Sequence, residues 1–158
     1  MTSASETAID VDDPRRPEVL AVLERHLGFC LSETPPEHSF ALDVGGLLDP
    51  RVTFVSCRDG DTVLGVAAIK ELDAEQVEVK SMHTVAEARG RGVGRALLSH
   101  LLEVAAARGY RRVFLETGTT PGFAAARALY ESTGFVLTGP FADYPVTGDN
   151  CFYTRTLP

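Results

Sequence analysis

The chain has 158 residues, of which 44% are hydrophobic and 23% are charged, so its length and composition predict one soluble globular domain over residues 1–158. Its 15 basic and 22 acidic residues give a net charge of −7, which argues against nucleic acid or an anionic membrane surface as a partner. No apolar run is long enough to span a bilayer, and the first residues lack the features of a signal peptide, so we expect a cytoplasmic protein.

The N-terminal segment is predicted to form a strand and a helix. Residues 7–12 favour a short strand, and either Asp12 or Asp13 is suited to cap the helix that follows. Apolar residues then recur with helical spacing, and Gly28 is the predicted end of the helix. Prolines, glycines and acids are mixed with apolar residues in 32–50, so we expect a short helix or an ordered loop there.

Three strands are predicted next. Residues 51–57 and 62–71 are rich in β-branched residues, and the Arg-Asp-Gly-Asp stretch between them predicts a hairpin turn. A second turn leads into residues 76–84, whose alternating pattern also predicts a strand. These three strands are expected to form an antiparallel meander.

A helix and a further strand follow the meander. From Val93, apolar residues recur with the period of a helix that ends before Gly109, and residues 111–117 form the next strand. A strand, helix and strand of this length predict a parallel strand pair with a pocket at the carboxyl ends of its strands. The remaining elements are predicted to be a helix and two closing strands, at residues 122–133, 135–137 and 150–157.

A glycine-rich loop connects the third meander strand to the helix, with the sequence Arg89-Gly90-Arg91-Gly92-Val93-Gly94-Arg95. The first N–H groups of a helix lack intrahelical acceptors and carry partial positive charge. Glycines admit an anion close to the backbone, and arginines add forked donors that suit phosphate oxygens. The predicted ligand is therefore a pyrophosphate.

Two nucleotide-binding patterns fit this loop poorly. The dinucleotide fingerprint needs a glycine where Arg95 stands, and the Walker pattern needs a lysine, but none follows Gly94. The structural alternative is a solvated, glycine-rich turn whose arginines only keep it soluble.

The cysteines and histidines form no recognisable ligand pattern. Cys30, Cys57 and Cys151 lack Cys-x-x-Cys spacing, and no two histidines have the spacing of a helical metal pair. We therefore expect reduced thiols and assign no metal site.

Two motifs give the chain a family resemblance. Residues 89–94 match the Arg/Gln-x-x-Gly-x-Gly/Ala motif of the GNAT superfamily of acyl-CoA-dependent N-acetyltransferases. Residues 128–135, Ala-Leu-Tyr-Glu-Ser-Thr-Gly-Phe, look like the family's Leu-Tyr-x-x-x-Gly-Phe segment. The chain resembles this superfamily over nearly its whole length, and residues 33–43 and 77–84 are most similar to small uncharacterised bacterial members.

The resemblance implies both a fold and an activity. The implied fold is α+β, with a mixed, mostly antiparallel sheet of about six or seven strands, about four helices and a parallel strand-helix-strand core. The implied activity is transfer of an acetyl group from acetyl-CoA, the cosubstrate, by direct attack of a primary amine of a small molecule: an amine, an amino acid or an antibiotic. The alternatives are a noncatalytic acyl-CoA-binding sensor, a protein N-acetyltransferase, and an interaction protein whose loop binds no coenzyme.

The resemblance also implies coenzyme contacts. The glycine-rich loop would hold the pyrophosphate, and backbone groups at the end of the third meander strand would contact the pantetheine arm and acetyl oxygen, because the family splays its strands there. The chain departs from the family at Phe123, where an asparagine often touches the pantetheine arm, so an apolar or stacking contact is expected instead. The expected contacts are Met82, His83, Thr84, Arg89, Gly90, Arg91, Gly92, Val93, Gly94, Arg95, Ala96 and Phe123.

Tyr130 is the expected general acid. A phenol is protonated at neutral pH and can return a proton to a departing sulfur, and in the family the tyrosine of this segment faces the coenzyme sulfur. The alternative from spacing alone is that Phe123, Ala126 and Tyr130 form one core stripe of a helix.

Glu78 is the expected general base. Strand alternation places it on the same face as Met82 and Thr84, toward the acceptor, and an ion pair with Lys80 or Lys70 is the alternative. His83 is the second candidate: the pKa of an imidazole suits a base, but strand alternation points this side chain to the other face. Glu116 is the third candidate.

Segments outside the coenzyme motifs are expected to frame the acceptor. Acidic and aromatic side chains in residues 32–48 and 139–150 suit a cationic amine, although acids on loops are more often simply solvated. The candidate acceptor contacts are Glu33, His38, Asp43, Glu116 and Tyr144. The chain is expected to act as a monomer or a homodimer.

Overall fold

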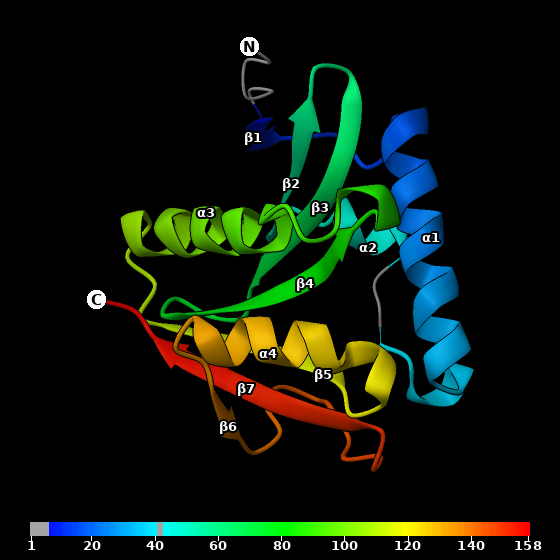
Figure 1. Ribbon diagram of the computed structural model, residues 1–158. Helices are drawn as coiled ribbons and strands as arrows, with labels where there is room; N and C mark the ends of the chain where they lie inside the picture. The colour runs from blue at the N-terminus through cyan, green and yellow to red at the C-terminus, as the bar shows by residue number, and fades with distance from the viewer. Residues whose placement is uncertain (1–6, 41–42) are drawn as a thin grey trace.

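The computed structural model describes residues 7–40 and 43–158, and its strands form one seven-stranded sheet (Figure 1). Apolar residues on both faces of the central strands, together with one face of each long helix, build the core. In chain order the elements are β1 (Thr7–Val11), α1 (Pro17–Glu33), η1 (Pro36–His38), α2 (Val44–Leu47), β2 (Val52–Asp59), β3 (Thr62–Glu71), β4 (Gln76–Thr84), η2 (Ala86–Ala88), α3 (Val93–Ala107), β5 (Arg112–Gly118), η3 (Pro121–Phe123), α4 (Ala124–Ser132), β6 (Val136–Thr138) and β7 (Asn150–Thr156).

The strand order is β1-β2-β3-β4-β5-β7-β6, which confirms the predicted mixed, mostly antiparallel sheet. Every neighbouring pair is antiparallel except β4 and β5, the two strands that α3 connects. The predicted parallel core is therefore confirmed. None of the helices in the described ranges has the length and apolarity needed to cross a membrane.

The parallel pair separates soon after it begins. β4 and β5 are in register only from Gln76 to Glu78, opposite Arg112 to Phe114. The later residues of both strands, 79–84 and 115–118, have no partner across this gap. Backbone groups on the facing edges are therefore available to a ligand, as the family resemblance implies.

A bulge in β4 changes which side chains share a face. Lys80 lies opposite Ala68 but His83 lies opposite Val66, so Ser81 and Met82 together oppose a single residue of β3. Ser81 adopts a positive φ of 56° at this bulge. Because the extra residue resets the alternation, His83 faces the same side as Lys80, and the expectation that it points to the other face is wrong. Thr84, opposite Gly65, lies on the face toward α3, so the expectation that it shares a face with Glu78 is also wrong.

Helix α1 is longer than predicted. It continues past Gly28 to Glu33, so the predicted end at Gly28 is wrong. The added turn is held by side-chain packing: Cys30 is buried, and the Phe29 ring meets the Phe123 ring edge-on with centroids 5.1 Å apart. We attribute the longer helix to this packing, which outweighs the roughly 1 kcal/mol that a glycine costs inside a helix.

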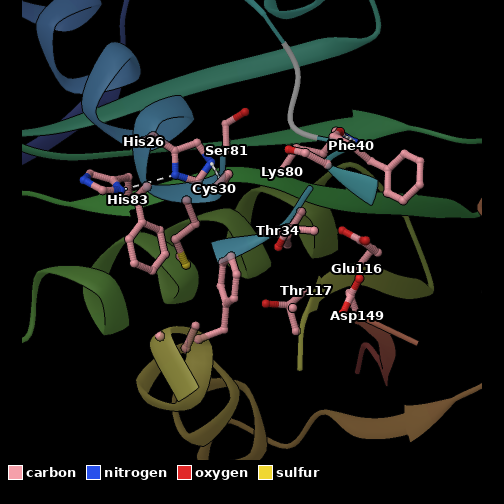
Figure 2. Close-up of a pocket in the computed structure, with 18 of the residues that line it drawn as sticks. His26, Cys30, Thr34, Phe40, Lys80, Ser81, His83, Glu116, Thr117 and Asp149 are labelled. Carbon is pink, nitrogen blue, oxygen red and sulfur yellow. Dashed lines mark hydrogen bonds between the residues drawn. The ribbon is translucent and has the colours of Figure 1, made fainter. Parts of the chain in front are cut away.

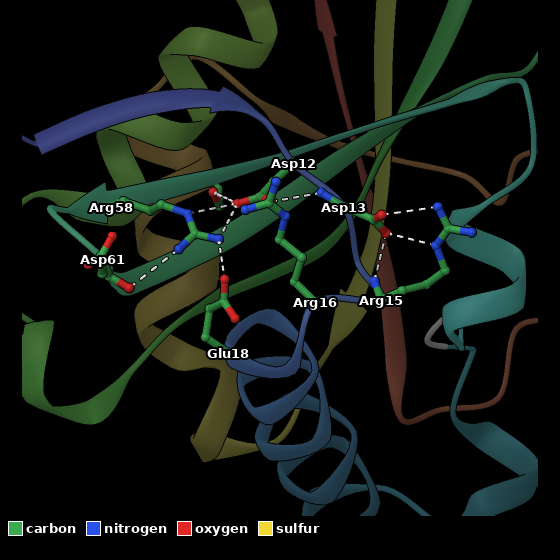
Figure 3. A network of polar contacts seen from close by, with 8 residues as sticks. Asp12, Asp13, Arg15, Arg16, Glu18, Arg58 and Asp61 are labelled. Atoms are coloured by element: carbon green, nitrogen blue, oxygen red, sulfur yellow. Dashed lines mark hydrogen bonds and ion pairs between the residues drawn. The ribbon is translucent and has the colours of Figure 1, made fainter.

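The aspartates expected to cap α1 bind arginines instead (Figure 3). The N-cap of α1 is Arg16, and no side chain of residues 7–40 and 43–158 caps the helix. Asp12 accepts a hydrogen bond from Arg58 Nε at 2.9 Å, and Asp13 accepts one from Arg15 Nε at 2.9 Å. The Asp12 pair ties the segment before α1 to β2.

Helices α1 and α3 cover opposite faces of β3 and β4. α3 approaches closely at Gly65, where an added Cβ would lie 2.9 Å from both Val93 Cγ1 and the His83 carbonyl oxygen. On the other face, His26 of α1 contacts His83. Gly65 thus fixes the first residue of α3 beside the end of β4.

Candidate active site

A pocket of about 150 Å³ lies where β4 and β5 diverge (Figure 2). Its wall joins α1, the α1–α2 loop, the diverging strand ends, α4 and the β6–β7 loop, which are far apart in the sequence. The lining residues are His26, Phe29, Cys30, Thr34, His38, Ser39, Phe40, Glu78, Val79, Lys80, Ser81, Met82, His83, Glu116, Thr117, Gly118, Gly122, Phe123, Ala126, Tyr130, Tyr144 and Asp149.

The glycine-rich loop lies just beyond the end of β4 and outside this lining. Gly90 and Gly92 adopt positive φ angles of 77° and 79°, and Gly92 is the N-cap of α3 with no side-chain cap. The first N–H groups of α3 are therefore not occupied by a capping side chain. An added Cβ at either glycine would meet no atom within 4 Å, so the backbone there is open to an anion.

The three arginines of the loop are exposed, and Val93 is buried in the core. Arg95 donates a hydrogen bond from its guanidinium to Ser132 Oγ at 2.9 Å, which links α3 to α4. Arg89 and Arg91 lie on the stretch that leads into the helix. The loop thus combines an uncapped helix start with exposed cationic side chains, the chemistry that a pyrophosphate requires.

Tyr130 reaches the pocket from α4. Its side chain is buried among Phe135 and Tyr153, and its hydroxyl donates to Met82 Sδ at 3.8 Å. Burial raises the pKa of the phenol above its usual value of 10.0. Tyr130 therefore carries its proton throughout the neutral range, beside the diverging end of β4.

Six polar residues form one side of the pocket, which we call the polar wall: His38, Glu78, Lys80, Glu116, Tyr144 and Asp149. At its centre, Lys80 Nζ lies 3.3 Å from Glu78 Oε2 and also donates to the Tyr144 hydroxyl. The Tyr144 hydroxyl in turn donates to Glu78. Burial, and then the nearby Glu78 carboxylate, raise the pKa of Tyr144, so this phenol stays protonated.

Two further polar groups flank this cluster. Glu116 projects from β5, and its pKa is raised by burial, although Asn150 and Lys80 act in the opposite direction. His38 Nδ1 lies 2.6 Å from Asp149 Oδ2, which joins η1 to the loop before β7. The polar wall therefore holds three carboxylates and one lysine.

The structure gathers most, not all, of the expected acceptor residues. His38, Glu116 and Tyr144 line the pocket, whereas Glu33 and Asp43 do not. Glu33 accepts a hydrogen bond from Thr120 at 2.9 Å, and Asp43 accepts one from the Gly46 N–H at 2.8 Å as the N-cap of α2. The Glu33 carboxylate links the end of α1 to the segment before η3, and the Asp43 carboxylate caps α2.

A histidine pair in the pocket wall was missed from the sequence. His26 Nδ1 lies 3.2 Å from His83 Nδ1, and Cys30 Sγ lies 3.8 Å from His26 Nε2. The spacing of His26 and Cys30, four residues apart on α1, was the available signal, because it places both on one helix face. The bulge that turns His83 toward them leaves no comparable trace in the sequence.

We expect this histidine pair to make the fold sensitive to acid. Burial is the main cause that lowers the pKa of both His26 and His83 to about 4, from a usual value of 6.5. Between these values the unfolded chain binds more protons than the folded one, so stability is lost as the pH falls from about 6.5 toward 4. At pH 5 the loss is about 2 kcal/mol per histidine.

Urea unfolding at pH 7 and pH 5 measures this loss. The double variant His26→Gln/His83→Gln should lose less free energy of unfolding between the two pH values than the wild type. His100→Gln, which changes a histidine of α3 outside the pocket, should keep the wild-type difference. An equal pH dependence in all three proteins would show that the pair is not the cause.

Three features together define the class of the GNAT-type acyltransferases. They are the splayed pair of β4 and β5, the pocket between these strands, and the uncapped start of α3 beside them. The model of the acetyltransferase (GNAT) family matches residues 16–135. The uncharacterized N-acetyltransferase YsnE from Bacillus subtilis (strain 168) is 41% identical over 149 residues, which cover 94% of this chain and 99% of the relative. The chain belongs to the GNAT family and is a GNAT-type N-acetyltransferase.

Solved structures show the same fold. A protein from Klebsiella pneumoniae subsp. pneumoniae, assigned to the acyl-CoA N-acyltransferases, has a TM-score of 0.82 at 24% identity and covers 97% of this chain and 99% of its own. A GNAT acetyltransferase from Elizabethkingia anophelis, solved with acetyl-CoA bound, has a TM-score of 0.67 at 14% identity, with coverage of 98% and 100%. At these identities the likeness extends to the fold alone.

Proposed function

We propose that this N-acetyltransferase uses acetyl-CoA and acetylates a primary amine of a small molecule by direct attack of that amine. The observation that carries the proposal is the pocket in the splay, which brings Tyr130 together with the carboxylates of the polar wall. The pocket has a volume of about 150 Å³, which favours a small acceptor over a protein surface.

The coenzyme contacts are proposed from the fit of the loop. Gly90 and Gly92 leave the backbone before α3 open, and the first N–H groups of α3 have no capping side chain, although the Ala96 N–H already donates to the Gly92 carbonyl oxygen. Arg89, Arg91 and Arg95 supply positive charge. Met82, His83 and Thr84 lie on the unpaired edge of β4, where backbone groups can hold the pantetheine arm and the acetyl oxygen. The acetyl-CoA-bound relative supports this cosubstrate. When bound, acetyl-CoA supplies an acetyl group activated as a thioester.

Where other family members often have a polar contact to the pantetheine arm, Phe123 offers an apolar one. Its ring lies over Gly118 at the end of β5, since an added Cβ there would come within 2.2 Å of the ring. On its other side the ring meets Phe29. Phe123 is therefore suited to close the pocket against water beside the reacting groups.

The proton transfers are assigned to residues that line the pocket. Tyr130 is the proposed acid, because its buried phenol holds a proton where the sulfur would leave. The proposed base is a carboxylate of the polar wall, Glu78 or Glu116. Glu78 is 3% exposed and its Oε2 accepts from both Lys80 and Tyr144, whereas Glu116 is in no ion pair within the described residues.

Acetyl-CoA turnover, followed by release of free thiol, tests the proposed function. A panel of amines, amino acids and aminoglycosides serves as acceptors, and calorimetry on the same sample measures coenzyme binding. We expect tight coenzyme binding and turnover with one acceptor class. Binding with no turnover would favour a noncatalytic sensor, and absence of binding would contradict the assignment of the glycine-rich loop.

A further inference from the structure

The only lysine of the polar wall has no donor left for a ligand. An ammonium group has three N–H donors, and Lys80 Nζ has three acceptors around it. These are Glu78 Oε2 at 3.3 Å, the Tyr144 hydroxyl, and the Phe40 carbonyl oxygen at 3.5 Å. Its side chain is only 9% exposed. Lys80 therefore has no free N–H donor for a carboxylate group on the acceptor.

The remaining charges of the polar wall are mainly negative. Glu78, Glu116 and Asp149 contribute three carboxylates, against Lys80 and, when it is protonated, His38. Even with His38 charged, the wall carries one uncompensated negative charge. A cationic acceptor neutralises this charge, whereas an acceptor with its own carboxylate adds a like charge in a partly desolvated space.

Glu116 is the carboxylate that lacks a cation. Glu78 pairs with Lys80, and Asp149 contacts His38, but no ion pair in residues 7–40 and 43–158 includes Glu116. Glu116 is partly buried, and a partly desolvated carboxylate without a paired cation gains free energy when it binds one. The raised pKa of Glu116 is consistent with this environment.

Four aromatic rings also line the pocket. Phe40 meets Tyr144 edge-on with centroids 5.5 Å apart, and Phe29 meets Phe123 in the same way. All four rings line the pocket. Such a surface suits an acceptor with a flat or apolar body.

We infer that the acceptor is a small amine with an apolar or aromatic body and no carboxylate group, and that Glu116 binds its ammonium. This inference rests on the proposed function and names its substrate class. The amine nitrogen bonds to the acetyl carbon as the carbon–sulfur bond breaks. The ammonium loses two protons in the reaction. Glu116 accepts one and passes it to solvent. Tyr130 gives its own proton to the departing sulfur and is reprotonated by the second.

Three acceptors that differ at one group test the substrate class: tyramine, tyrosine and tyrosinamide. Tyramine lacks the carboxylate of tyrosine, and tyrosinamide keeps its size but not its charge. We expect kcat/KM for tyramine to exceed that for tyrosine by about 100-fold, because like charges oppose each other in the pocket. Tyrosinamide should fall close to tyramine.

The variant Glu116→Gln tests the assigned residue. We expect kcat/KM for tyramine to fall about 30-fold, through the loss of a charge-assisted contact, and the preference over tyrosine to shrink. The affinity for acetyl-CoA, measured by calorimetry, should stay unchanged. The melting temperature should stay unchanged or rise, because a partly buried carboxylate without a paired cation is removed. Glu103→Gln, an exposed change on α3, is the matched control and should leave all four values unchanged.

The outcomes separate this inference from the proposed function. Equal or faster turnover of tyrosine, or tyrosinamide behaving like tyrosine, would overturn the substrate class while the acetyltransferase assignment stands. Unchanged tyramine kinetics in Glu116→Gln would overturn the role of Glu116. Coenzyme binding without turnover of tyramine or tyrosinamide would also overturn the substrate class, whereas absence of coenzyme binding would contradict the proposed function itself.

Discussion

Gly92→Asp is expected to weaken acetyl-CoA binding by about 1000-fold, which corresponds to about 4 kcal/mol. Two effects add. Gly92 has a φ of 79°, and an L-residue with a Cβ pays roughly 1–2 kcal/mol to adopt this conformation. The new carboxylate would also stand at the uncapped start of α3, where it can accept from the first N–H groups and repel a pyrophosphate.

Two control variants separate these effects in the same calorimetric titration. Gly92→Asn has nearly the shape and the backbone preference of Gly92→Asp without its charge, so it keeps the conformational cost alone, and binding should weaken by only about 10-fold. Gly60→Asp places the same residue at another positive φ, 59°, in the hairpin between β2 and β3. That variant should bind acetyl-CoA as the wild type does. If Gly92→Asp binds as tightly as Gly60→Asp, the loop does not hold the pyrophosphate.

The elements around this loop were predictable because their signals are local. The strands at residues 62–71 and 76–84 have the predicted bounds, and α3 begins at Val93 as its apolar period indicates. Alternation, an Asp-Gly turn and helical spacing all act over fewer than about ten residues, so a single sequence contains them. The family resemblance then supplied the splay, which no local pattern encodes.

The bulge in β4 shows where local reasoning ends. Ser81 is not a residue that signals a positive φ, yet its φ is 56°, and its buried hydroxyl has no hydrogen-bond partner within the described residues. The conformation is therefore imposed by the packing around β4 rather than by the residue itself. One extra residue then moved His83 onto the face of Lys80, which strand parity alone could not foresee.

The polar wall depends on contacts across the whole chain. Glu78 and Tyr144 are hydrogen-bonded although 66 positions separate them. The sequence analysis selected both residues, for chemistry suited to an amine, but the pairing needs the β6–β7 loop to fold back over β4. Selection by residue type alone also included Asp43, whose carboxylate caps α2. Residue chemistry thus identifies candidates, and tertiary structure decides which of them meet.

Tyr130→Phe is expected to lower kcat by about 1000-fold, within the 10²–10⁴ range typical of a general acid or base. The phenol is the proposed proton donor to the departing sulfur, and phenylalanine keeps the ring but removes the proton. The ring contacts with Phe135 and Tyr153 remain, and the lost hydroxyl has only the weak contact to Met82 Sδ. Folding and coenzyme affinity should therefore be almost unchanged.

Tyr153→Phe is the matched control for this change. Tyr153 is equally buried, and its hydroxyl donates to Glu131 at 3.0 Å outside the pocket. Its loss should cost about 1 kcal/mol of stability and leave kcat unchanged. Single-turnover kinetics with acetyl-CoA and a saturating amine measure the chemical step directly. Wild-type rates in Tyr130→Phe would remove Tyr130 as the acid.

The pH dependence of kcat adds an independent test of Tyr130. Because burial raises its pKa above 10.0, the phenol stays protonated up to at least pH 10, so the acid is not lost in the neutral or mildly alkaline range. Activity should therefore rise with pH as the bound ammonium loses its proton through Glu116 and then level off, without a falling limb below pH 10. If kcat of the wild type falls near pH 8 and kcat of Tyr130→Phe does not, Tyr130 loses its proton near that pH. That result would contradict the raised pKa of this phenol.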